Sequence, residues 1–356
     1  MNDTNAFLAR LLQQGGRALA AYAANELLES RPEAKAGFGA DPFSGWRNWL
    51  GGRLDELAAA VAAEQPGLFV AQVQWAKAVM AARGFSAEHL RAGLEALRSV
   101  LAGELPEEVR PLAADYLDRA LEAFDQQPAE LSARLLPDTP QRRLASQYLL
   151  ALLEGDRRRA SRLILEAADR GEAVPELYLD VLLPAQEELG RMWLLGEINV
   201  AEEHFASATT KTVMAQLMPR ATFRPGNGKT VLAAAVAGNQ HDIGLQAVAD
   251  FFEMDGWRTI QLGANVPIAD LAQAVDFFEV DLLGLSASQS TQLEAVKETI
   301  EAVRAAERGR RVKILVGGLA FAGTDGLPGR LGADGYAAHP AEAVGLGRRL
   351  VGIDEP

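Results

Sequence analysis

Apolar residues recur at helical spacing from the start of the chain to about residue 135. Leu90, Leu94, Leu97 and Leu101 fall on one face of a helix, and Ser86 precedes them as an N-cap. Pro- and Gly-rich breaks interrupt other apolar stretches, which indicates turns between short helices. The pattern predicts an all-α domain over residues 1–135.

A second helical region follows from residue 140 to residue 225. Gly196 interrupts its apolar spacing, and Asn199 then precedes a further run with Glu202 three residues later. This arrangement is typical of a capping box at the start of a helix. Four helices joined by short connections predict a four-helix bundle.

Beyond Lys229, apolar runs of strand length alternate with helical patterns. Such alternation favours a doubly wound parallel sheet, in a Rossmann-like or flavodoxin-like domain over residues 229–356. The predicted fold class is therefore multidomain, α and α/β. The expected strands cover residues 231–237, 258–263, 282–286, 313–316 and 335–337.

Composition narrows the partners and the compartment. The formal net charge of -13 argues against nucleic acid, so no direct DNA binding is expected. The basic clusters Arg157–Arg159 and Arg308–Arg311 are typical of solvated helix ends or turns. The chain has no cysteine, which excludes disulfides and thiolate metal sites and predicts a cytoplasmic protein. No apolar stretch is long enough for a membrane span, so no membrane partner is expected.

The first strand of the α/β domain leads directly into a loop that holds His241. Ligands bind at the carboxyl edge of open parallel sheets, and Gly244 allows a close approach of the backbone. The third and fourth strands end in small residues, which predicts a slot for a flat group with a histidine at its mouth. A loop histidine without a ligand is the alternative. The small residues are Ser286, Ser288, Gly317 and Gly318.

These positions resemble the motif of cobalamin-binding domains: Asp-x-His-x-x-Gly, then Ser-x-Leu, then Gly-Gly. The resemblance implies that His241 ligates cobalt from below and that the slot holds the nucleotide base of the cofactor. Asn239 stands in place of the carboxylate, which argues against methyl-transfer turnover, and Ser288 replaces the leucine. The matching stretches are Asn239-Gln240-His241-Asp242-Ile243-Gly244, Ser286-Ala287-Ser288 and Gly317-Gly318.

The bundle carries a second pattern, in which Trp193 is followed nine residues later by Glu203-His204, with Val200 between them. A core tryptophan and a solvated Glu-His pair would give the same spacing. Beside a cobalamin domain, however, the pattern resembles that of B12-dependent photoreceptors, which bind adenosylcobalamin. The resemblance implies that Trp193 packs on the adenosyl group, Glu203 hydrogen-bonds it, and Val200 and His204 shape the pocket. Leu194 occupies the position of a histidine that captures cobalt in the repressors of that family.

The N-terminal helices resemble non-haem globin-like sensor domains. Their combination with a B12 module is similar to photocobilins, which pair cobalamin with a bilin. This resemblance implies noncovalent biliverdin as a second chromophore, since the chain has no cysteine to hold it. A dimerisation or partner-docking domain is the alternative.

Two functions follow from these patterns. The leading hypothesis is a light-sensing regulatory protein without enzymatic activity, in which Co–C photolysis changes the conformation or the association of a homo-oligomer that signals to an unidentified protein. The alternative hypothesis is a corrinoid methyl carrier, a subunit of a methyltransferase system.

Overall fold

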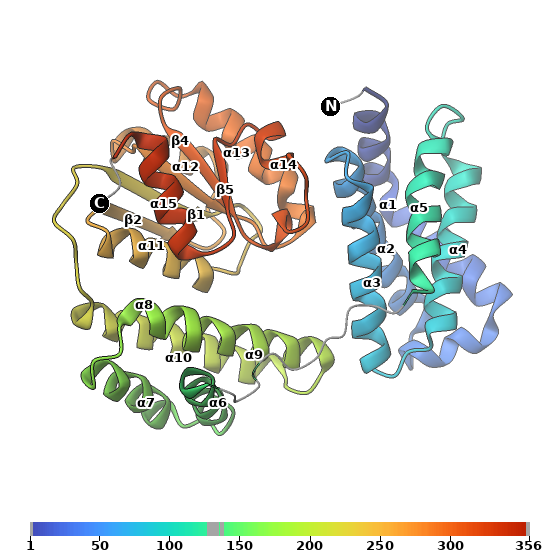
Figure 1. Cartoon of the computed structure of the whole chain (residues 1–356). Coiled ribbons are helices and arrows are strands. Elements are labelled where there is room, and N and C mark those ends of the chain that lie inside the picture. Colours follow the sequence, from blue (N-terminus) through green and yellow to red (C-terminus); the bar gives the residue numbers. More distant parts are fainter. Residues whose placement is uncertain (1–2, 127–134, 136–138, 354–356) are drawn as a thin grey trace. The chain divides into compact units, whose positions relative to one another are not determined.

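The computed structural model describes residues 3–126, 135 and 139–353, which fall into two compact units, the N-terminal helices and the rest of the chain (Figure 1). None of the helices in these residues has the length and the apolar character that a membrane crossing requires. The predicted domain limits, 1–135, 140–225 and 229–356, stay predictions.

The N-terminal unit is entirely helical, as the apolar spacing predicts. Trp46 is fully buried, and its indole nitrogen donates to the carbonyl of Ala34 at 2.9 Å. The prolines at the starts of three helices supply the fixed φ that suits a first helical turn. A resemblance to globins stays a prediction. The helices are α1 (Asp3–Ser30), α2 (Pro42–Ala62), α3 (Pro66–Ala82), α4 (Ala87–Glu104) and α5 (Arg110–Phe124), with a 3₁₀ segment at Pro32–Phe38.

The second unit begins with the predicted helical bundle. Asn199 caps the last helix and its side chain accepts from the amides of Ala201 and Glu202, while Glu202 accepts from the Asn199 amide at 2.8 Å. The predicted capping box is thus confirmed. The elements are α6 (Pro140–Leu153), α7 (Arg157–Asp169), α8 (Val174–Leu177), a π-helical segment (Tyr178–Leu182), α9 (Leu183–Leu195) and α10 (Val200–Leu217), followed by a 3₁₀ turn at Met218–Arg220.

A five-stranded parallel sheet follows, with the strand order β2-β1-β3-β4-β5. This is the flavodoxin-like order, whose topological switch point lies between β1 and β3. The α/β prediction is confirmed, although β1 ends two residues earlier than predicted, because the chain turns at residues 237–238. The strands are β1 (Thr230–Ala235), β2 (Arg258–Gly263), β3 (Leu282–Ser286), β4 (Lys313–Gly317) and β5 (Gly335–Ala337); the helices are α11 (Ile243–Met254), α12 (Ile268–Phe277), α13 (Leu293–Ala305), α14 (Leu327–Arg330) and α15 (Pro340–Val351).

Helix α11 joins the sheet to the bundle. Ala247, Phe251 and Met254 are buried in the same apolar cluster as the bundle helices. The hydroxyl of Tyr178 in the π-helical segment donates to Asp250 Oδ2 at 2.7 Å. Because α11 starts directly after the loop that carries His241, this packing places the bundle beside the predicted ligand site.

Candidate functional site

The loop after β1 holds His241 at the carboxyl edge of the sheet. Gly238 turns the chain with φ at +82°, a left-handed conformation that favours glycine, and its amide donates to Asn265 Oδ1 at 2.7 Å. The Asn265 amide in turn donates to the Asn239 carbonyl at 2.9 Å. The loops after β1 and β2 therefore brace each other, and the exposed His241 stands on a firmly held backbone.

Asn239 determines which nitrogen of His241 is available. Asn239 is completely buried, and its Nδ2 donates to the carbonyl of Ser286 at 2.9 Å, which turns Oδ1 toward the histidine. Oδ1 accepts from the His241 amide at 3.1 Å and lies 3.3 Å from His241 Nδ1. An amide oxygen can only accept, so this contact requires the proton on Nδ1. Nε2 is then left with its lone pair free for a metal.

The loop after β3 supplies polar groups beside the histidine. Ser286 and Ser288 are half-buried at the end of the strand. The Gln292 side chain binds this loop to the first one, since its Oε1 accepts from the Ser288 amide at 2.8 Å and its Nε2 donates to the Gly238 carbonyl at 3.2 Å. Ser290 is buried, and its hydroxyl has no partner within the described residues.

An orphaned buried hydroxyl of this kind costs about 1–3 kcal/mol. It would be relieved by a polar group entering the slot from outside the chain. The sequence motif does not include Ser290 or Gln292. Their closeness in sequence to Ser286 was the only signal that they belong to this edge.

The motif glycines differ in what they require. A Cβ added at Gly244 would meet nothing within 4 Å, and its φ is not left-handed, so the protein's own packing leaves this position open. That open space fits the close approach of a bulky ligand. At Gly318 (φ +98°), by contrast, a Cβ would lie 2.2 Å from the Ala287 carbonyl, and at Gly317 it would lie 3.0 Å from the Ala337 carbonyl. The double glycine is therefore already required by the close approach of neighbouring loops.

The bundle residues lie around the turn between α9 and α10. Trp193 is 39% exposed and Val200 is 53% exposed, so both leave apolar surface open to solvent beside this turn. Glu203 Oε2 lies 2.5 Å from His204 Nδ1, and Glu203 Oε1 accepts from the Ser207 hydroxyl at 2.6 Å. Both carboxylate oxygens of Glu203 are thus engaged within the bundle itself.

One ion pair links the bundle to the motif loop. Lys211 Nζ lies 2.5 Å from Asp242 Oδ1, beside His241. Glu203, Ser207 and Lys211 follow one another at steps of four residues, which places them on one face of α10. The sequence patterns did not identify Lys211 as a site residue, although its position eight residues after Glu203 places both on the same face of the helix.

Together, these features form a site at the sheet edge with room and donor groups for a large planar metal cofactor. The site fits a corrinoid: His241 offers Nε2, Gly244 leaves open space, and Ser290 offers an unpaired hydroxyl. Exposed Leu319 adds apolar surface directly after Gly318.

Comparison with known proteins gives the family. Residues 229–345 match a B12 binding domain, and residues 144–218 match a second B12 binding domain. The chain is 30% identical over 164 residues to dimethylamine corrinoid protein 3 of Methanosarcina mazei. The alignment covers 46% of this chain and 95% of that protein. It is 29% identical over 195 residues to dimethylamine corrinoid protein 3 of Methanosarcina acetivorans, over 53% of this chain and 89% of that protein. The chain therefore belongs to the corrinoid protein family and is a cobalamin-binding protein.

A solved structure agrees with the fold. The monomethylamine corrinoid protein of Methanosarcina barkeri superposes with a TM-score of 0.53 at 19% sequence identity, and the match covers 59% of this chain and 99% of that chain. The match reproduces the helical region followed by the α/β domain.

The light-sensing hypothesis is wrong. The two curated relatives above are named as dimethylamine corrinoid proteins, which favours the alternative hypothesis instead. The physical reason for the error lies in the bundle pattern, because Glu203 is satisfied by His204 and Ser207 and needs no adenosyl group. The matches support a cobalamin cofactor, but they do not say whether its upper ligand is adenosyl. They give no support to biliverdin.

Proposed function

We propose that this protein is a corrinoid methyl carrier of a methyltransferase system. The observation that carries the proposal is the match to a dimethylamine corrinoid protein over 95% of that protein's length, so that the chain holds the counterpart of nearly an entire carrier. When bound, cobalamin supplies a cobalt centre that accepts a methyl group from one partner and gives it to another.

The residues of the sheet edge would hold the cofactor. His241 would provide Nε2 as a ligand to the cobalt, and Asn239 keeps the proton on Nδ1. Ser286, Ser288 and Ser290 offer hydroxyls to polar groups in the slot. The remaining motif positions would line the space around the cofactor, and an ion pair with Lys211 holds Asp242 in place. These positions are Gln240, Asp242, Ile243, Gly244, Gly317 and Gly318.

Asn239 does not prevent this function. The amide oxygen accepts from Nδ1 at 3.3 Å, as a carboxylate would, and so orients the ring. Unlike a carboxylate, the amide cannot itself take up a proton, so it orients the ring without accepting the proton from Nδ1.

The bundle residues would border the cofactor. Trp193 and Val200 carry exposed apolar surface that would keep water from the reactive metal, while Glu203 and His204 would form the polar border. The partners would be the methyltransferases that load and unload the carrier. In this proposal, the chain would also self-associate, and its N-terminal helices would serve as a docking domain.

Retention of the cofactor tests the proposal. A carrier has to keep its corrinoid with and without the methyl group, since losing it in one form would end the cycle. The full chain is titrated in the dark with methylcobalamin and separately with hydroxocobalamin, and affinity is measured from the visible spectrum after desalting. We expect both forms to be retained, with dissociation constants within about tenfold, or about 1.4 kcal/mol. Retention of only one form would contradict a carrier.

A further inference from the structure

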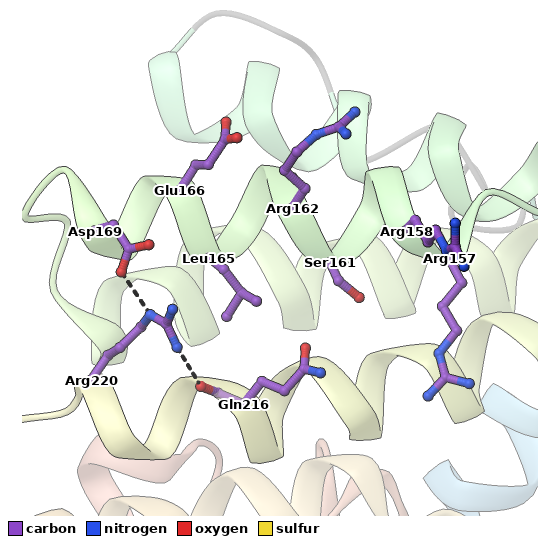
Figure 2. A pocket seen from close by; sticks show the side chains of 9 residues that line it. All are labelled: Arg157, Arg158, Ser161, Arg162, Leu165, Glu166, Asp169, Gln216 and Arg220. Carbon is purple, nitrogen blue, oxygen red and sulfur yellow. Dashed lines mark hydrogen bonds and ion pairs between the residues drawn. The ribbon is translucent and has the colours of Figure 1, made fainter.

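A groove rich in arginine lies between α7 and α10, on the bundle (Figure 2). Its volume is about 670 Å³. The residues that line it include four arginines and two carboxylates, and Figure 2 shows the arginines spread along the groove rather than converging on one point. The arginines are Arg157, Arg158, Arg162 and Arg220.

The two ends of the groove differ in charge. At one end, Arg220 Nε donates to Asp169 Oδ1 at 2.8 Å, and this hydrogen bond lowers the pKa of Asp169. At the other end, Arg157 Nη2 donates to the neutral hydroxyl of Thr212 at 3.0 Å, and Arg157 makes no ion pair within the part of the chain that the structure describes. Arg158 and Arg162 are exposed and make no hydrogen bond or ion pair with the residues that the structure describes. Asp156 caps this end of the helix and Glu154 pairs with Arg159, so the positive charge left without an ion pair among the described residues is that of Arg157, Arg158 and Arg162.

This arrangement opposes the stability of α7. Arg157, Arg158 and Arg159 fill the first turn, where the helix dipole favours negative side chains and a cation is unfavourable. Arg158 and Arg162 are also like charges at i and i+4, which repel each other. Of the three arginines in the first turn, Arg159 alone has a carboxylate partner among the described residues, Glu154 at 2.6 Å. Stability alone does not explain this set of charges, whereas an anionic partner in the groove would.

We propose that the groove docks an acidic segment of a partner protein. Arg157, Arg158 and Arg162 cover about 7.5 Å along the axis of α7, and Arg220 lies at the far end of the groove beside Asp169. Cations spread in this way suit a row of carboxylates better than a single phosphate group. The chain as a whole carries a net charge of -13, which repels any polyanion, so attraction of an acidic segment would be confined to this groove. Charge complementarity of this kind gives orientation and speed to protein association. The groove does not depend on the proposed methyl-carrier function.

A labelled acidic peptide tests this proposal. Fluorescein-labelled poly-glutamate of about eight residues, long enough at ~3.3 Å per residue to span the groove, is titrated with the full chain at low salt, and anisotropy is recorded. We expect saturable binding that weakens with salt, and at least a tenfold weaker dissociation constant for the double variant Arg158→Glu/Arg162→Glu. The milder Arg158→Gln/Arg162→Gln variant should weaken binding in the same direction.

The matched control is Arg310→Glu/Arg311→Glu, which makes the same charge change in the other basic cluster. These two arginines are exposed, and we expect the control to bind the peptide within about twofold of the wild type. Circular dichroism confirms that each variant is folded. The proposal fails if the wild type does not bind, if both glutamate variants lose binding equally, or if an oligonucleotide of the same charge binds more tightly than the peptide.

Discussion

The sheet edge and the α9–α10 turn hold the two patterns that mark this chain, and they differ in what remains unsatisfied. At the sheet edge, the Ser290 hydroxyl has no partner within the described residues, and the space beside Gly244 is open. At the turn, both oxygens of Glu203 are already bonded to neighbours. A pattern whose groups need a ligand is informative about function, whereas a spacing whose groups satisfy one another is not.

Removal of His241 is expected to cause the largest loss of cobalamin affinity of all the changes considered for the two regions. His241→Ala deletes the lower ligand, so cobalamin affinity should fall by about 100-fold or more, at least the loss seen when a supporting residue of a metal ligand is removed. Affinity is measured by titration followed at visible wavelengths. His89→Ala, in the N-terminal unit, is the matched control and should bind cobalamin as the wild type does. Equal affinity of the two variants would show that the sheet edge does not hold the metal.

Because the space at Gly244 is open, a larger side chain there should affect stability and cobalamin binding in opposite directions. Gly244→Ala should stabilise the cofactor-free protein by about 0.5–1 kcal/mol, because the position is helical and a Cβ meets nothing there. The same change, and more strongly Gly244→Leu, should weaken cobalamin binding, by about tenfold for leucine. Chemical denaturation and spectral titration measure the two quantities.

Gly52→Ala provides the control for this pair of effects. Gly52 is also helical with nothing within 4 Å of an added Cβ, but it lies in the N-terminal unit. It should stabilise the protein without changing cobalamin affinity. If Gly244→Leu binds cobalamin like the wild type, the open space has another purpose.

The contact between Tyr178 of the bundle and Asp250 of α11 should depend on pH. Burial raises the pKa of Asp250 to about 6 from its ordinary 3.8, although the Tyr178 hydroxyl opposes this. A raised carboxyl pKa favours folding at low pH, and this contribution is lost as the pH rises toward the folded value of about 6. The wild type should therefore lose about 1 kcal/mol between about pH 5 and pH 7 relative to Asp250→Asn. Denaturant titrations of both proteins at the two pH values test this, and parallel pH profiles would refute it.

Glu203→Gln should have the smallest effect. The amide can still accept from Ser207, so cobalamin affinity should change by less than about threefold, or about 0.6 kcal/mol. A large loss of affinity would mean that the carboxylate itself reaches the cofactor, and the contrast between the two regions would then disappear. Glu202→Gln, a neighbour in the capping box, serves as the control for effects on the helix start.

The sequence allowed much of the fold to be predicted, because the relevant signals are local. Apolar runs identified the strands, and Asn199 with Glu202 identified the start of α10. His241 could be placed at a sheet edge from the strand that precedes it. Contacts between distant segments, such as Lys211 with Asp242 and Gln292 with Gly238, could not be predicted, because no periodicity encodes them. The function was misjudged for the same reason, since spacing does not reveal that Glu203 is satisfied by Ser207.

The central claim is that His241 ligates the cobalt of a bound corrinoid. The most direct measurement is the electron paramagnetic resonance spectrum of the full chain, labelled with [¹⁵N]histidine and loaded with unlabelled cobalamin that has been reduced by one electron. The account predicts that the nitrogen splitting changes from the triplet of the unlabelled protein to a doublet, and that His241→Ala removes the doublet. A triplet that persists in the labelled protein would show that the cofactor's own base ligates the metal, and would contradict the account.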